Sequence, residues 1–211
     1  MTIPLPVEHR HVGIFAGGDR QTLELREAEG EPSRLVGYAA VFNSLSGNLG
    51  GFREKLLPGA FSASLANAEL DVRALVDHDY KRIMGRRSAG TLRLSEDDVG
   101  LRIANDPPDT SYARDLLASI RRGDIRGMSF GFYVDDDGER WTRDGDDVVR
   151  VLTRVELVEV TFTSIPAYPA ASVDLRQHPA LARVPDEVRG RVPSPRHRRI
   201  ERARRMLTIA G

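Results

Sequence analysis

Residues 126–132, RGMSFGF, place a serine where it could act as a nucleophile. The apolar residues at positions 128, 130 and 132 alternate with Gly127, Ser129 and Gly131, so a half-buried strand would turn the serine to the face opposite the apolar side chains. The two glycines leave the serine hydroxyl without side-chain neighbours along its own strand, so a substrate backbone could approach closely. We predict that Ser129 is a nucleophile; the alternative is a structural strand of small residues.

Residues 72–79, VRALVDHD, place a candidate general base where a strand ends. Alternation puts His78 on the same face as Ala74 and Val76. Imidazole is the usual base for a serine hydroxyl, because near neutral pH it can take the proton and later return it to the leaving amine. Asp77 and Asp79 are expected to be turn residues rather than partners of His78. The alternative is a structural histidine. The remaining histidines lie in the chain ends, where we expect no catalytic role: His9, His11, His178 and His197.

A serine and its base normally need a third group that holds the imidazole in the correct tautomer. Alternation along residues 148–163 places Glu159 on a largely apolar face with Leu157 and Thr161, whereas Glu156 shares its face with Arg154. A carboxylate buried on an apolar face is costly unless a group such as His78 pairs with it. We therefore predict Glu159 as the third residue. A β-bulge would exchange the two faces and favour Glu156.

The elements that must carry these residues are mainly strands. Extended runs rich in β-branched and apolar residues, separated by Gly, Pro and Asp, occupy 34–42, 71–78, 90–106, 127–134 and 148–163. They predict a mainly β protein with flanking helices (α+β), built on a mainly antiparallel sheet or barrel. Helices are expected at 62–70 and 110–124. In the second helix, Leu116, Leu117 and Ile120 share a face, Thr110 or Ser111 can cap the start, and Gly123 suits the end.

Composition suggests one domain with appendages. We expect residues 1–33 to form a loose N-terminal arm that contributes one short strand, residues 34–176 to form the catalytic domain, and residues 177–211 to form a basic, mobile tail. The whole chain has no net charge, but between Arg176 and Arg205 ten arginines face three carboxylates, a net charge of +7. A nucleic-acid role is not expected, because this tail has no interleaved aromatic residues for stacking on bases.

The sequence also argues against several function classes. The chain has no cysteine, which excludes disulfides, thiolate nucleophiles and cysteine-ligated metals. No run approaches the roughly 20 apolar residues that cross a bilayer. The N-terminus does not resemble a secretory signal, so the protein is expected to stay where it is made. No His and carboxylate cluster has ligand spacing such as HExxH, which weakens a metal-dependent hydrolase. We expect neither a metal nor a cofactor.

Five segments in this order resemble the prohead serine proteases of tailed bacteriophages, a family thought to share its fold with herpesvirus capsid assembly proteases. The segments are GYAAVFN at 37–43, LLPGAF at 56–61, LVDHD at 75–79, IRGMSFGF at 125–132 and LVEVTFTSIPAYPAA at 157–171. The resemblance covers roughly residues 35–176. It places Ser129 and His78 on the family's serine and histidine, and Glu159 on the carboxylate before the closing Pro-Ala-rich segment.

The resemblance implies a small, mostly antiparallel β-barrel of the herpesvirus-protease type, flanked by helices. It also implies a serine endopeptidase that cuts scaffold protein or the N-terminal extension of the major capsid protein, and itself, inside the immature shell in the bacterial host cytoplasm. Self-association is compatible with it. The competing hypothesis is a non-catalytic, β-rich capsid or assembly component, in which Ser129 and His78 would lie far apart.

Overall fold

The computed structural model describes residues 8–12, 23–27, 33–49, 51–134, 136–164 and 183–189. The strands within these ranges are β1 (Glu8–Val12), β2 (Leu23–Arg26), β3 (Arg34–Val41), β4 (Arg53–Leu56), β5 (Arg73–Val76), β6 (Asp79–Arg86), β7 (Leu92–Glu96), β8 (Gly100–Asn105), β9 (Gly127–Tyr133), β10 (Glu139–Asp144), β11 (Asp147–Leu152) and β12 (Glu156–Thr163). The helices are α1 (Ser62–Ala66), α2 (Ser111–Arg122) and α3 (Asp186–Arg189), with a 3-10 turn at Asp136–Gly138.

The strands form three sheets, which confirms the prediction of a mainly β protein with flanking helices. Their orders are β1-β9-β12-β5-β6, β2-β3-β8-β7 and β10-β11-β4. Most neighbours are antiparallel, but β5 runs parallel to β12, and β4 runs parallel to β11. The closed barrel implied by the family resemblance is not found among the described residues, where each sheet ends in edge strands.

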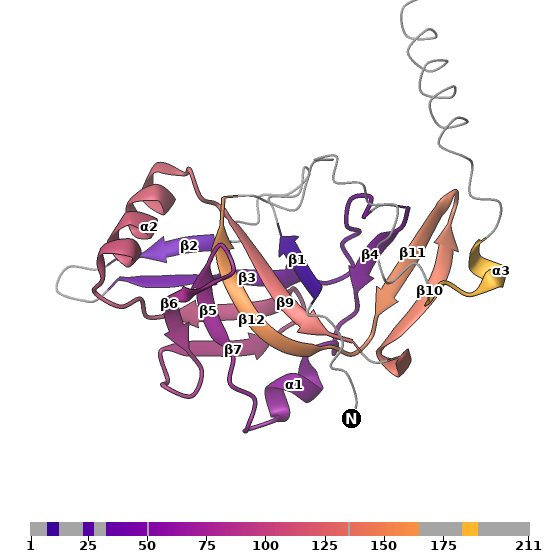
Figure 1. Ribbon diagram of the computed structural model, residues 1–211, viewed down its shortest axis with the longest axis horizontal. Helices are drawn as coiled ribbons and strands as arrows, with labels where there is room; N and C mark the ends of the chain where they lie inside the picture. The colour runs from indigo at the N-terminus through magenta and orange to yellow at the C-terminus, as the bar shows by residue number, and fades with distance from the viewer. Residues whose placement is uncertain are drawn as a thin grey trace, which may run out of the picture.

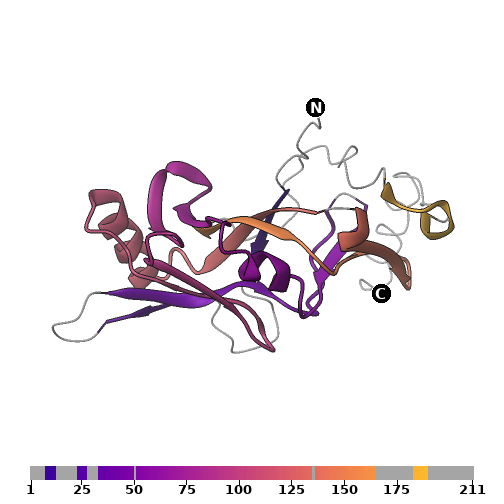
Figure 2. The ribbon, with the colours of Figure 1, turned by 90° about the horizontal axis from the view of Figure 1, so that it is seen from below.

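The main hydrophobic core lies between the five-stranded and the four-stranded sheet, which run as two layers in Figure 2. Phe130, Phe132 and Phe162 come from the first sheet, and Leu35 and Ile103 from the second; all five are fully buried. Burying such side chains stabilises the fold by roughly 1.5–3 kcal/mol each. One face of the five-stranded sheet therefore packs in the main core, and the opposite face does not.

The two predicted helices are present. Helix α2 runs as expected, with Leu116 and Leu117 buried and a left-handed Gly123 at its end. Thr110 stands at the N-cap position, but its side chain makes no capping hydrogen bond. Helix α1 ends at Ala66 rather than at residue 70, because Asn67 turns to an extended conformation and its side chain accepts a hydrogen bond from the Glu69 amide. No helix in the described ranges is long and apolar enough to cross a membrane.

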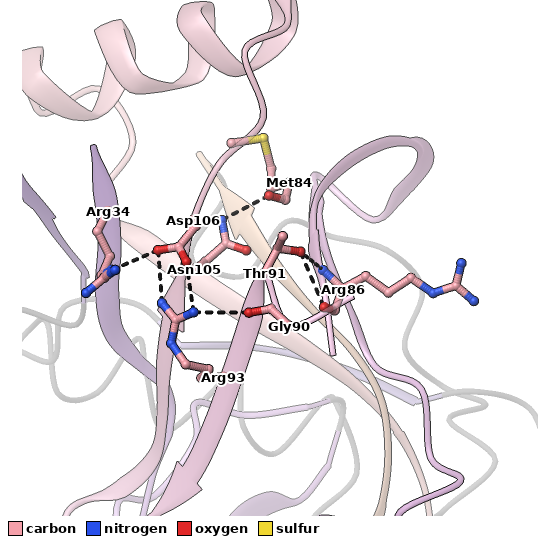
Figure 3. Close-up of polar contacts among 8 residues, drawn as sticks. All are labelled: Arg34, Met84, Arg86, Gly90, Thr91, Arg93, Asn105 and Asp106. Carbon is pink, nitrogen blue, oxygen red and sulfur yellow. Dashed lines mark hydrogen bonds and ion pairs between the residues drawn. The ribbon is translucent and has the colours of Figure 1, made fainter. Parts of the chain in front are cut away.

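A polar network joins the four-stranded sheet to the end of β6 (Figure 3). The carboxylate of Asp106, just after β8, accepts hydrogen bonds from Arg34 on β3 and Arg93 on β7, at 2.7 and 2.8 Å. Beside it, the Asn105 side-chain amide donates to the carbonyl of Met84 at 3.1 Å. A Cβ at Gly85 would stand only 1.9 Å from Asn105 Oδ1, so glycine is required for this close approach.

Several strands were not predicted from the sequence. Residues 1–33, expected to contribute one short strand, contribute β1 and β2. Strands β4, β6 and β10 were also missed; β6 and β10 are edge strands rich in charge, which lack the apolar alternation of half-buried strands. Most of the predicted tail 177–211 lies outside the described residues. Its described part, residues 183–189, packs on the three-stranded sheet, where Val184 joins a small core with Phe52 and Val148 (Figure 1).

Candidate active site

Ser129 lies on β9, the second strand of the five-stranded sheet, on the face away from the main core. Strand β9 is hydrogen-bonded to β1 on one side and to β12 on the other, with Ser129 opposite His11 and Thr161. Residues directly opposite in an antiparallel pair point to the same face, so Ser129 and Thr161 share a face while Phe130 and Val160 enter the core. The sequence predicted a half-buried strand; in the structure both faces of β9 are covered, and Ser129 is fully buried.

His78 lies in a tight turn and not at the end of a regular strand, which corrects the alternation argument. Val76 on β5 pairs directly with Asp79 on β6, so that Asp77 and His78 are the two turn residues. Both have positive φ angles, 47° and 59°, as the central residues of a type I′ hairpin do. Asp and His tolerate this left-handed region better than most side chains. This two-residue turn leaves the backbone of His78 little freedom and so fixes the position of its imidazole.

Two hydrogen bonds attach this turn to β12. The Asp77 amide donates to the carbonyl of Phe162 at 3.0 Å, and the His78 amide donates to Thr161 Oγ1 at 3.0 Å. Thr161 was not singled out from the sequence, because its position opposite Ser129 depends on strand pairing that the sequence does not reveal. Its hydroxyl places the turn bearing His78 on the face of the sheet that carries Ser129.

His78 and Glu159 form a direct pair. Nδ1 of His78 lies 2.7 Å from Oε1 of Glu159; the Glu159 side chain is fully buried, and that of His78 is 22% exposed. Burial raises the pKa of Tyr80 on β6, and the nearby negative charge of Glu159 raises it further. Burying a carboxylate is unfavourable unless it is paired, and the imidazole supplies the partner. The structure thus joins these two predicted residues.

A β-bulge at the start of β12 decides which glutamate faces the site. Leu157 pairs with Phe132 and Glu159 with Gly131, so Val158 is an extra residue in β12. Leu157 therefore enters the main core, and Glu159 lies with Thr161 on the opposite face. Regular alternation would put Leu157 and Glu159 on one face, and a bulge was expected to favour Glu156. The bulge is present, but it precedes Glu159 and leaves it beside Thr161, whereas Glu156 is exposed.

A serine, a histidine and a buried carboxylate on one face of a sheet are the residue types that serine hydrolases combine. Among the described residues no group of three or more His, Asp or Glu side chains is arranged to hold a metal ion. Residues 21–183 match the family described as caudovirus prohead serine protease, and the chain belongs to this family.

One relative carries a similar description. The chain is 30% identical over 148 residues to the prohead protease of Enterobacteria phage HK97. The alignment covers 69% of this chain and 60% of the phage protein, so the chain matches well under two thirds of that relative's length. No solved structure matches the chain, and the kinship in fold with herpesvirus proteases stays a prediction.

Proposed function

We propose that the chain is a serine endopeptidase of prohead maturation, with Ser129 as nucleophile, His78 as general base and Glu159 as the group that orients His78. The observation that carries this proposal is the contact of His78 with the fully buried Glu159 at 2.7 Å, held on the sheet face of Ser129 through Thr161. A buried carboxylate at Nδ1 leaves Nε2 as the imidazole nitrogen for proton exchange with a hydroxyl.

The expected chemistry is acyl transfer. The Ser129 hydroxyl oxygen attacks a peptide carbonyl while His78 takes its proton. The tetrahedral intermediate collapses when the His78 imidazolium returns that proton to the leaving amine, which leaves an acyl-serine. A water molecule, deprotonated by His78, then attacks the ester and regenerates the serine hydroxyl. Glu159 stabilises the transient imidazolium throughout.

Membership of the prohead protease family supports a substrate inside the assembling shell. We propose the major capsid protein, a scaffold protein or both as substrates, and the chain itself as a further one, in the cytoplasm of a bacterial host. The division into an arm at 1–33, a catalytic domain at 34–176 and a tail at 177–211 belongs to this proposal. In it, the basic tail docks the enzyme in the shell or is removed by self-cleavage.

One observation favours the second candidate function, a non-catalytic capsid or assembly component. Ser129 is fully buried, and a nucleophile must be reached by its substrate. Under the catalytic proposal the chain around Ser129 opens when a peptide binds. Under the alternative, the pair of His78 and Glu159 only stabilises the turn between β5 and β6.

Co-expression with the major capsid protein separates the two functions. We expect the wild-type chain to remove a segment from the capsid protein, seen as a loss of intact mass, and the Ser129→Ala variant to leave that mass unchanged. Ser119→Ala is the matched control, since this serine lies on α2 and its hydroxyl donates to the carbonyl of Asp115 at 3.0 Å. Unchanged masses with the wild-type chain would favour the non-catalytic component.

A further inference from the structure

We propose that Ser64 and Arg87 form a clamp that sets the position of Glu159 relative to His78, and that both are positioning residues of the site. Ser64 lies on α1, and Arg87 follows β6 directly. The inference rests on the roles proposed for His78 and Glu159. It is carried by two sets of contacts: one fixes the bulge of β12, and the other fixes the hairpin that bears His78.

Ser64 supplies hydrogen bonds to the edge of β12 at residues that have no neighbouring strand on that side. Strand β5 begins to pair with β12 only at Glu159, so the residues of β12 before the bulge lack that neighbour. The buried hydroxyl of Ser64 donates to the carbonyl of Val155 at 2.7 Å and accepts from the amide of Leu157 at 2.9 Å. The amide of Val155 also donates to the carbonyl of Ala60, at 2.9 Å. The segment 60–64 therefore continues the sheet beside residues 155–157.

The hydrogen bonds of Ser64 lie directly beside the bulge of β12. Leu157 is the last residue in register before the bulge, and Glu159 is the first residue after it. A shift of one residue in a strand moves every side chain to the other face. If the bulge relaxed while Leu157 stayed in the core, the residues after it would change faces together, and Glu159 and Thr161 would both turn toward the main core. The Ser64 hydroxyl thus holds the strand in the register that aims Glu159 at His78.

Arg87 ties α1 to the hairpin of His78. Its guanidinium donates to four carbonyls at the end of α1 and just beyond it: Leu65 at 2.7 Å, Asn67 at 2.9 Å, Leu70 at 3.2 Å and Ser64 at 3.5 Å. Its backbone amide donates to the carbonyl of Val72, immediately before β5, at 2.9 Å. The planar guanidinium suits such divergent acceptors, and an ammonium group does not. One side chain therefore links the helix that fixes Glu159 to the hairpin that carries His78.

The test uses Ser64→Ala, which removes both hydroxyl bonds, and Ser64→Thr, which keeps them. Ser62→Ala is the matched control on the same helix, because the Ser62 hydroxyl bonds to Glu96 and not to β12. The first readout is the proton NMR resonance of the His78 Nδ1–H, which moves far downfield when it is hydrogen-bonded to a carboxylate. The second is the rate at which a fluorophosphonate probe labels Ser129.

We expect Ser64→Ala to lose the downfield resonance and to label about 10- to 100-fold more slowly, the loss typical of a slightly misplaced catalytic group. Ser64→Thr should recover both to within about threefold of wild type, and Ser62→Ala should change neither. If Ser64→Ala keeps the resonance and the labelling rate, or if Ser62→Ala loses them equally, the clamp is disproved. Lower thermal stability alone, with both readouts intact, disproves it as well.

Arg87→Lys tests the other half of the clamp, and it replaces Ser64→Ala as the main test if that variant does not fold. It keeps the charge but removes the forked donors, and we expect a weaker downfield resonance and slower labelling than in wild type. An unchanged resonance in a folded Arg87→Lys variant overturns this half. The NMR readout needs no activity: if the wild-type chain shows the resonance but is not labelled, the proposed function fails while the clamp is still decided by the resonance.

Discussion

Two buried charged clusters in this chain solve the same physical problem in different ways. On the three-stranded sheet, Arg150 of β11 is fully buried and bonds to Glu54 of β4 at 3.0 Å and to Glu139 of β10. On the five-stranded sheet, the fully buried Glu159 is paired with His78, whose side chain remains 22% exposed. Both clusters compensate carboxylates that have been removed from water, but only the second contains an imidazole, the side chain that most often acts as a general base.

The difference shows what each cluster is suited to. A guanidinium stays protonated at all accessible pH values, and Arg150 is held from several sides, with its charge also 5.9 Å from the centre of the Trp141 ring. Such a cluster can fix how three strands pair, but it cannot move a proton. His78 lies in a turn at the end of a hairpin; its side chain is partly exposed although Nε2 itself is buried, and Glu159 orients the ring from the Nδ1 side. That arrangement suits proton transfer.

The largest effect is expected from Glu159→Gln, which keeps the shape of the side chain but removes its charge. By analogy with the loss of the orienting carboxylate in other triads, labelling of Ser129 by a fluorophosphonate should fall by about 10³- to 10⁴-fold. Glu156→Gln is the matched control on the same strand, because Glu156 is exposed. If the two variants are labelled at equal rates, Glu159 does not assist Ser129, and the pair of His78 and Glu159 is structural like the cluster of Arg150.

A large loss of stability, rather than of chemistry, is expected from Arg150→Met. Removing this guanidinium breaks the buried ion pairs with Glu54 and Glu139, although Arg183 still lies 3.7 Å from Glu139. This loss should lower the free energy of unfolding by about 3–5 kcal/mol. Arg154→Met, which breaks an exposed pair with Asp137, should change it by no more than about 1 kcal/mol. Denaturant unfolding measures both values. Slower labelling of Ser129 in the folded fraction of Arg150→Met would contradict the division of roles.

Much of the fold follows from local patterns in the sequence. The strands β3, β5, β9 and β12 and the helix α2 were predicted because their apolar residues repeat at the strand or helix period over many positions. Strands β6 and β10 lack this repeat, since they lie at sheet edges and at least half of their side chains are charged. The arrangement into three sheets depends on long-range pairing, such as the parallel contact of β12 with β5, which no local pattern encodes.

The candidate site was predicted for partly correct reasons. Ser129, His78 and Glu159 were found from residue type and alternation, and the contact of His78 with Glu159 is present. The positive φ of His78 was not predicted, and a β-bulge was considered only as a feature that would favour Glu156, because the turn and the position of the bulge depend on how neighbouring strands pair. Thr161, Ser64 and Arg87 were missed, since an isolated Thr, Ser or Arg in a sequence carries no signal of its partner. Catalytic roles for the three predicted residues remain predictions.

The smallest effect is expected at a third cluster, which is only partly removed from water. Hydrogen bonds from Arg93, and then from Arg34, lower the pKa of Asp106 to about 2 from its usual value, although burial opposes the shift. A carboxyl group whose pKa is lower in the folded state stabilises the fold above its ordinary pKa, and this contribution is lost as the pH falls from about 4 to about 2. The Asp106 side chain is 36% exposed, so solvent screening limits the contribution to about 1 kcal/mol.

Asp106→Asn should therefore lower the melting temperature by about 2–4 °C at pH 7, and the difference from wild type should shrink as the pH approaches 2. Asp109→Asn serves as the control, since the Asp109 side chain pairs with Arg114 while 89% exposed and should change little at either pH. Thermal melts between pH 7 and about pH 2 measure the trend. Two results would contradict this comparison: a loss of stability in Asp106→Asn as large as that in Arg150→Met, or a loss that does not change with pH. Either result would mean that Asp106 stabilises the fold through packing between the sheets rather than through its charge.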